Sequence, residues 1–170
     1  NVNSKTFKVV AGGTSDGIKF GNPTFANNSY TLITVARYSG ATKQRIFDGD
    51  GDNYLHGFFN GSSGVAHHNG WVTAQGDVHG SNWVLGTSFA SNYRSNGFSR
   101  GTSGGTANLG PLGLNYGTYF ATQSSNFEVA EVLIFNYQLN ATQIRQVEDY
   151  LSQTYGITLS SPGSYPTSSS

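Results

Sequence analysis

Cysteine is absent from this sequence, and charged residues are scarce. Without cysteine, neither a disulfide framework nor a thiolate metal site can form. Charged residues make up 11% of the chain, and 9 Lys and Arg balance 9 Asp and Glu. A neutral chain lacks the basic stripe that a phosphate backbone requires, which argues against a nucleic-acid partner. No apolar run approaches the roughly 18 residues of a membrane span, so we expect no membrane insertion.

Serine, threonine, asparagine and glycine must therefore cover much of the surface, which suits a partner that is itself neutral and polar. The chain begins without Met and without a signal segment, so we expect a fragment of a longer protein with further domains. The stretch SSPGSYPTSSS has almost no apolar content to offset the entropy of ordering it. We therefore expect one domain over residues 1–159 and a Ser/Pro-rich linker or tail over residues 160–170.

Short runs of β-branched and aromatic residues alternate with Gly, Asn and Ser along the chain. Asn-Gly pairs occur at 60–61, 69–70 and 96–97, and they favour hairpins because a type I′ turn needs positive φ at both central residues. Runs at this spacing predict an antiparallel two-sheet sandwich. The runs cover residues 6–11, 17–20, 30–38, 44–48, 54–59, 64–73, 82–89, 93–100, 112–117 and 127–135.

One amphipathic helix is predicted near the C-terminal end, within LNATQIRQVEDYLSQTYGI. Asn140 and Gln143 have the spacing of a capping box, and Gly156 suits a left-handed C-terminal cap. The apolar residues at helical spacing are Ile144, Val147, Leu151 and Tyr155. The predicted fold class is therefore all-β, a sandwich closed by one short C-terminal α-helix.

The segment FEVAEVLIFNYQLNATQIRQVEDYLSQTYGI (127–157) resembles the C-terminal signature of concanavalin A-like jelly-roll domains of the laminin-G type. In that class an Ala-Glu-apolar strand is followed by Phe/Tyr-Asn, a loop, and a helix that ends in Tyr-Gly. Residues 93–117 look like the preceding hairpin. Residues 53–71 are similar to a segment of family members from secreted microbial proteins and from structural proteins of large algal viruses.

The resemblance implies two curved antiparallel sheets, with a concave face or a rim of loops that takes a sugar or a protein, often beside calcium. It also implies an extracellular or virion-surface location. Lectins, adhesion modules, pentraxin-like binders and glycosidases share this architecture, so the function has to be argued from a site.

Glu128 and Glu131 are the one candidate pair of catalytic carboxylates. A glycosidase needs two carboxyl groups that face each other across the sugar. Residues three apart on a regular strand point to opposite faces, and Glu131, among apolar neighbours, is expected to be a buried hydrogen-bond anchor to a backbone turn or to Arg37. No nucleophile-elbow, zinc-protease or phosphate-loop motif is present, so we expect no enzymatic activity.

The stretch FDGDGDNYLHGFF (47–59) holds three carboxylates, Asp48, Asp50 and Asp52. An EF-hand is excluded, because its sixth position would be Asn in place of Gly and its twelfth Phe in place of Glu. Two alternatives stay open, a simpler calcium site and a plain hairpin turn.

The histidines indicate no metal site. His67 and His68 are adjacent on a predicted strand, so their rings project to opposite faces and cannot share one ion. Asp77 and His79 have compatible spacing, but two ligands do not make a zinc site, and His79 is expected to be an exposed loop residue.

Aromatic residues beside turn amides are the candidates for sugar binding, because a ring stacks on the apolar face of a sugar while amides bind its hydroxyls. Each of these aromatic residues could instead belong to the core, as we expect for Trp83. The candidate ligand-binding residues are Tyr54, Trp71, Tyr93, Asn53, Asn69 and Asn92.

The sequence favours a non-catalytic module that recognises glycan on a target cell. A structural module that contacts neighbouring protein subunits without binding sugar is the alternative, and a glycosidase or lyase ranks third.

Overall fold

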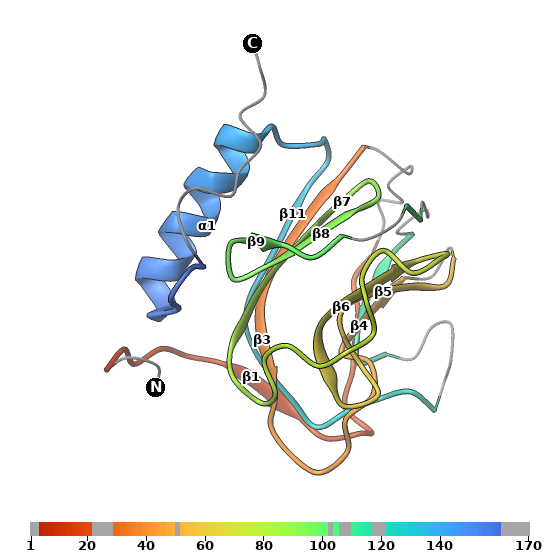
Figure 1. Cartoon of the computed structure of the whole chain (residues 1–170). Helices are drawn as coiled ribbons and strands as arrows, with labels where there is room; N and C mark the ends of the chain where they lie inside the picture. Colours follow the sequence, from red (N-terminus) through yellow and green to blue (C-terminus); the bar gives the residue numbers. More distant parts are fainter. Residues whose placement is uncertain are drawn as a thin grey trace.

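Two antiparallel β-sheets lie face to face, and one helix covers the outer side of the larger sheet (Figure 1). The structure is a computed structural model that describes residues 4–21, 29–49, 52–101, 104–105, 110–116 and 122–160. The predicted fold class, an antiparallel jelly-roll sandwich with one short C-terminal helix, is confirmed. Residues 161–170 of the predicted tail lie outside the described ranges.

Each sheet mixes strands from distant parts of the chain. The six-stranded sheet has the order β1 (Val10–Gly12), β11 (Phe127–Phe135), β3 (Thr31–Tyr38), β7 (Val84–Phe89), β8 (Asn92–Ser95) and β9 (Phe98–Ser99). The five-stranded sheet has the order β2 (Ile18–Lys19), β10 (Leu112–Leu114), β4 (Phe47–Gly49), β5 (Tyr54–Phe59) and β6 (Ser62–His68).

Strand β3 is buried on both faces. Leu32 and Ala36 point into the core between the two sheets, while Ile33 and Val35 point to the other side, where the helix packs. This placement fits the sequence of the strand, in which neither face is predominantly polar before Arg37, because alternate residues of a strand face opposite sides. The core between the sheets also contains Tyr30, Tyr38, Phe47, Tyr54, Phe58, Val84, Leu112, Leu114, Phe127 and Val129.

Helix α1 (Ala141–Tyr155) has the predicted caps at both ends. The Asn140 side chain accepts a hydrogen bond from Gln143 N at 2.9 Å, and Gln143 Oε1 accepts one from Asn140 N at 3.0 Å. Gly156 ends the helix in the left-handed conformation, with φ of 70°. Among the described residues, no helix is both long enough and apolar enough to cross a membrane.

A buried ion pair fixes α1 to the six-stranded sheet. Glu148 is fully buried and accepts a hydrogen bond from Arg94 Nε of β8 at 2.9 Å and another from Thr87 Oγ1 of β7 at 3.0 Å. Arg94 also donates to the carbonyl of Gly97 at 2.7 Å. Both charges are thus surrounded by partners, as buried ions require.

Two of the predicted Asn-Gly turns join neighbouring strands. Asn60-Gly61 joins β5 to β6 with φ of 47° and 85°, and Asn96-Gly97 joins β8 to β9 with φ of 47° and 79°. Both have the positive φ pair of a type I′ turn. Asn69-Gly70 differs, because Gly70 has φ of 152° and the pair follows the end of β6.

Replacement of Glu148 by Ala should destabilise the protein by about 3–5 kcal/mol, because Arg94 would stay buried without its carboxylate. Chemical denaturation measures this loss. Asp149→Ala is the matched control, since Asp149 pairs with Arg145 at 3.5 Å on the exposed side of α1 and should cost less than about 0.5 kcal/mol. Equal losses in the two variants would contradict a dominant role for the buried pair.

Candidate functional site

A row of residues crosses the outer face of the five-stranded sheet, opposite the core. The pairing register places Lys19 beside Gly113, Gly113 beside Asp48, Asp48 beside Leu55, Leu55 beside His67, and His67 beside Trp71. Directly paired residues of antiparallel strands share a face, so these side chains form one line, which we call the outer row. Its middle, Asp48 and Leu55, is buried, whereas Trp71 at one end is partly exposed.

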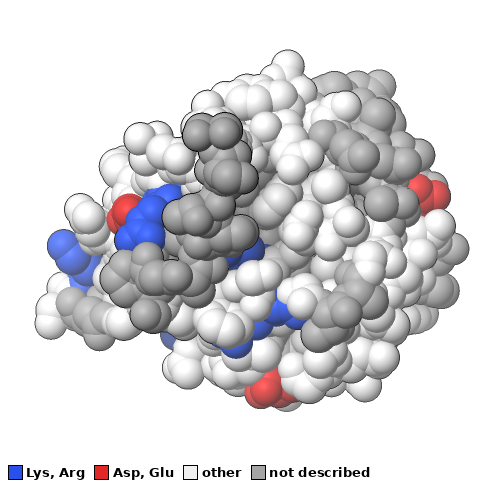
Figure 2. Space-filling model, turned by 45° about the horizontal axis from the view of Figure 1, so that its top comes forward, with Lys and Arg blue, Asp and Glu red and all other residues white. Residues whose placement is uncertain are grey.

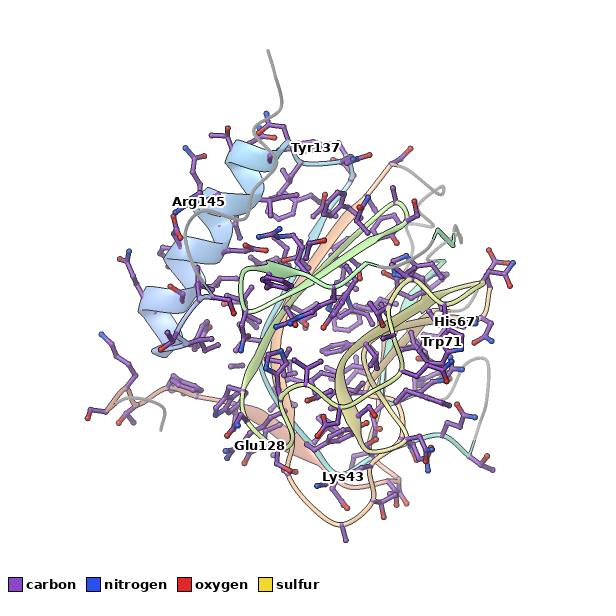
Figure 3. The ribbon with its side chains drawn as sticks, in the orientation of Figure 1. Lys43, His67, Trp71, Glu128, Tyr137 and Arg145 are labelled. Carbon is purple, nitrogen blue, oxygen red and sulfur yellow. The ribbon has the colours of Figure 1, made fainter. Side chains whose placement is uncertain are left out.

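Trp71 sits between two other rings at the edge of the sheet. Its ring lies edge-on to Phe59 at 5.6 Å and to His67 at 5.2 Å between centroids. His67 and Trp71 lie next to each other on the side of the molecule away from α1 (Figure 3). These contacts fix the orientation of the indole while part of it stays open to solvent.

Two amide side chains come from turns next to Trp71. The Asn69 backbone N–H donates to the carbonyl of Asn53 at 2.9 Å, which joins the two turns. Arg45 Nη2 donates to Asn53 Oδ1 at 2.8 Å, and Arg45 Nε donates to Gln123 Oε1 at 2.6 Å. The buried guanidinium of Arg45 therefore fixes the orientation of the Asn53 side chain.

The structure brings together three of the six predicted ligand-binding residues, Asn53, Asn69 and Trp71. Tyr54 and Tyr93 are 0% exposed, so neither ring presents a face to solvent, and both belong to the core, the alternative left open for each. Their positions on strands explain this, because β5 and β8 turn these two side chains toward the opposite sheet.

Asn92 is exposed and begins β8, at the β7–β8 hairpin. His68 Nδ1 donates to the carbonyl of Ala90 in this hairpin at 2.8 Å, so the hairpin is joined to the end of β6. Asn92 therefore belongs to a neighbouring turn and has no described hydrogen bond to the turns of Asn53 and Asn69.

The three aspartates are not equivalent. Asp48 is 2% exposed and lies against Gly113, where a Cβ would clash with its Oδ1. Asp52 is partly exposed and precedes Asn53, while Asp50 lies outside the described residues. Within the described part of the chain no three His, Asp or Glu side chains come together as a metal site would need, so calcium stays a prediction that depends on Asp50.

Glu128 and Glu131 lie on the same face of β11, and the prediction of opposite faces is wrong. The reason is a β-bulge between Val129 and Glu131, which pairs Glu128 with Arg37 and Glu131 with Val35. Positions 35 and 37 share a face of β3, so the extra residue restores the parity of the two acids.

The two acids nevertheless have separate partners on this face. Glu128 accepts from Arg37 Nε at 2.5 Å. Glu131, expected to be buried against a turn or Arg37, is only half-buried and accepts from Tyr155 Oη of the helix at 2.7 Å. Burial and the neighbouring Glu131 carboxylate both raise the pKa of Tyr155, so its hydroxyl stays a donor.

Ser95 and His79 resemble a nucleophile and its base but are arranged differently. Ser95 Oγ lies 2.8 Å from His79 Nε2 and 2.9 Å from Arg100 Nε, yet Ser95 is 0% exposed. The Asn96 amide oxygen already accepts a backbone N–H, so its Nδ2 faces His79 Nδ1 at 3.5 Å. The imidazole proton is therefore on Nε2 and is donated to Ser95, which leaves no base for that hydroxyl.

Asp77 does not act as the acid that would orient His79 in a catalytic arrangement with Ser95. Its Oδ1 accepts hydrogen bonds from the backbone N–H groups of Ser63 and Gly80 at 2.8 and 3.1 Å. His79, expected as an exposed loop residue, is half-buried. Burial and the Arg100 charge lower the pKa of His79.

Two other histidines are buried between the sheets. His56 Nε2 lies 2.9 Å from Thr34 Oγ1, and His56 Nδ1 lies 2.6 Å from Ser88 Oγ. Burial lowers the pKa of His56 to about 3 and that of His68 to about 4, each with a smaller contribution from a neighbouring histidine. Both imidazoles are therefore neutral parts of the core at neutral pH.

Charged residues are scarce in this protein, at 11% of the chain. On the face that Figure 2 shows, most atoms of the described residues belong to residues other than Lys, Arg, Asp and Glu. At the end of the outer row opposite Trp71, Lys19 Nζ lies 5.8 Å from the ring centroid of Tyr116, which is 51% exposed. A partly exposed aromatic ring thus lies near each end of the row.

The predicted site residues did not include four residues in or near the outer row, namely His67, Lys19, Tyr116 and Gly113. The alternation of side chains along each strand could have predicted which face of its own strand each residue occupies. The pairing of residue 19 with residue 113 is a long-range register that no local pattern in the sequence reveals.

No protein-family model matches this chain, and no curated protein matches it either.

The free energy of unfolding should fall as the pH is lowered from about 6.5 toward about 4. His56 and His68 titrate near 6.5 when unfolded but far lower when folded, so in this window the unfolded chain binds more protons. Between pH 7 and pH 5 each histidine should contribute a loss of roughly 2 kcal/mol. Urea denaturation across this range is the measurement.

His68→Asn keeps a donor for the Ala90 carbonyl and removes one titrating group, so it should roughly halve the loss between pH 7 and pH 5. A free energy of unfolding that is the same at both pH values would contradict neutral burial of the two imidazoles.

Proposed function

We propose that this protein is a non-catalytic carbohydrate-binding and adhesion module that recognises glycan on a target cell surface. The observation that carries this proposal is the partly exposed Trp71, held edge-on by Phe59 and His67, with the joined turns of Asn53 and Asn69 next to His67. The resemblance of residues 127–157 to laminin-G-type concanavalin A-like domains supports the same class. It also supports an extracellular or virion-surface location within a larger protein.

The chemistry near Trp71 matches a sugar. An indole offers an apolar face for the C–H side of a pyranose ring, while amide groups exchange hydrogen bonds with its hydroxyls. Asn53 is held by Arg45, so its orientation is set before a ligand arrives, which reduces the entropy lost on binding. The neutral surface suits an uncharged glycan.

The acidic side chains that would serve catalysis have other partners. Glu128 pairs with Arg37, and Glu131 accepts from Tyr155 of α1. Both acids lie on the outer face of the six-stranded sheet, whereas Trp71 lies at the edge of the five-stranded sheet. Holding sugar without cleaving it is consistent with that separation. Calcium is the proposed cation of the loop that carries Asp48, Asp50 and Asp52, since hard cations take carboxylate oxygens.

Trp71→Ala should weaken glycan retention by about tenfold or more, which is about 1.4 kcal/mol, because the stacking platform is lost. Trp71→Phe should retain part of the affinity. The measurement is a glycan array followed by titration of the glycans retained, with and without EDTA. Loss of retention in EDTA would support calcium.

Tyr150→Ala is the matched control, because Tyr150 is 66% exposed on α1, away from the outer row. It should bind as the unchanged protein does, and thermal unfolding of each variant verifies that it is folded. Failure of the unchanged protein to retain any glycan would instead favour a module for contacts between protein subunits. Turnover of a glycan that disappears in Glu131→Gln would favour a glycosidase or lyase.

A further inference from the structure

We propose that Asn69 is a site of spontaneous deamidation, selected by the fold from among the three Asn-Gly pairs of the chain. Asn60, Asn69 and Asn96 are each followed by glycine and have nearly the same φ, 47°, 49° and 47°. Sequence and φ therefore do not separate them. Their hydrogen bonds do.

The reaction needs a free nucleophile and a free electrophile. The backbone nitrogen of the glycine attacks Cγ of the asparagine, and a new N–Cγ bond forms as the Cγ–Nδ2 bond breaks. The nitrogen's proton is lost to hydroxide, and ammonia leaves with a proton from water. Water then opens the resulting succinimide at either carbonyl, which gives aspartate or isoaspartate without any oxidant or reductant.

At Asn60 the nucleophile is occupied. The Gly61 N–H donates to the carbonyl of Lys43 at 2.9 Å, and this hydrogen bond must break before the nitrogen can attack. The Asn60 side chain is exposed, so the protection comes from the glycine alone.

At Asn96 the electrophile is occupied. Its Oδ1 accepts from Leu85 N at 2.8 Å, and its Nδ2 faces His79 Nδ1 at 3.5 Å. The carbonyl of Asn96 also accepts from Ser160 N at 2.7 Å. The amide is half-buried and held from both sides, so Cγ cannot turn toward Gly97.

At Asn69 neither group is held. The side chain is exposed and makes no hydrogen bond to a described residue. The Gly70 N–H points to His67 Nδ1 at 3.4 Å, but the same nitrogen lies 2.9 Å from the carbonyl of Asn53. A carbonyl only accepts, so Nδ1 carries the proton and has no lone pair for Gly70. The attacking nitrogen therefore has no acceptor among the described residues.

The modification would add a negative charge, and in isoaspartate an extra backbone atom, two positions before Trp71. Its effect on glycan binding rests on the proposed function, whereas the reaction itself does not. The site would then lose affinity with age, at a rate that rises with hydroxide concentration.

The test is peptide mapping of the whole chain after incubation at mildly alkaline pH, with fragmentation that locates each converted amide. The same incubation in urea gives the rate of each pair in the unfolded chain, so the folded-to-unfolded ratio at each site removes the influence of neighbouring sequence. We expect deamidation at Asn60 and Asn96 to be about tenfold or more slower in the folded protein than in urea, and deamidation at Asn69 to be slowed much less. Asn69→Gln should abolish conversion at 69 and leave the other two sites unchanged.

If folding slowed deamidation at Asn69 as strongly as at Asn96, the assignment of Asn69 as the reactive site would be overturned. The consequence is tested separately by glycan retention of Asn69→Asp against the matched Asn60→Asp. If Asn69 deamidates but Asn69→Asp still retains glycan fully, the modification site stands. That result would count against Trp71 as the residue on which glycan stacks.

Discussion

Burial of both faces of β3 is the constraint on which the rest of the structure depends. Leu32 and Ala36 need a second sheet above them, while Ile33 and Val35 need a cover below, and α1 supplies it. A three-layer arrangement of helix, sheet and sheet follows, as Figure 1 shows. The buried pair of Glu148 and Arg94 then fixes the position of α1 along the sheet, because a displaced helix would leave both charges without partners.

This arrangement places the polar groups of the molecule in three separate regions. The face beneath α1 holds Glu128 and Glu131 with their own partners, and the space between the sheets holds neutral His56 and His68. The outer row lies on the outer face of the five-stranded sheet, and the turns of Asn53 and Asn69 lie at its Trp71 end. Partly exposed amides and a partly exposed indole come together there, and this combination favours a neutral polar ligand.

The sequence predicted the elements whose causes are local. The capping box of Asn140 and Gln143, the left-handed Gly156 and the type I′ turns at 60–61 and 96–97 depend on a few adjacent residues, and all are present. The fold class followed from strand spacing and turn residues. The sequence predicted only that Asn53, Asn69 and Trp71 each stand beside a turn. The structure joins the two asparagine turns by the hydrogen bond from Asn69 N to the Asn53 carbonyl, next to His67 and Trp71.

The features that the sequence did not predict depend on long-range register. One inserted residue in β11 places Glu128 and Glu131 on the same face, and nothing in VAEVLIF marks the bulge. Tyr54 and Tyr93 stand next to turn residues, but strand alternation turns their rings into the core. The neighbours in the outer row, such as Lys19 and Gly113, are far apart in sequence, so only the assembled sheet brings them together.

The central claim is that glycan is held at Trp71, and chemical-shift mapping tests it most directly. The isotope-labelled protein would be titrated with an oligosaccharide that the array identifies, while the indole N–H of Trp71 and the backbone amides are followed. The account predicts shifts at the Trp71 indole and at Asn53, with no change along α1. Shifts confined to α1 or to β9, with the Trp71 indole unmoved, would contradict it.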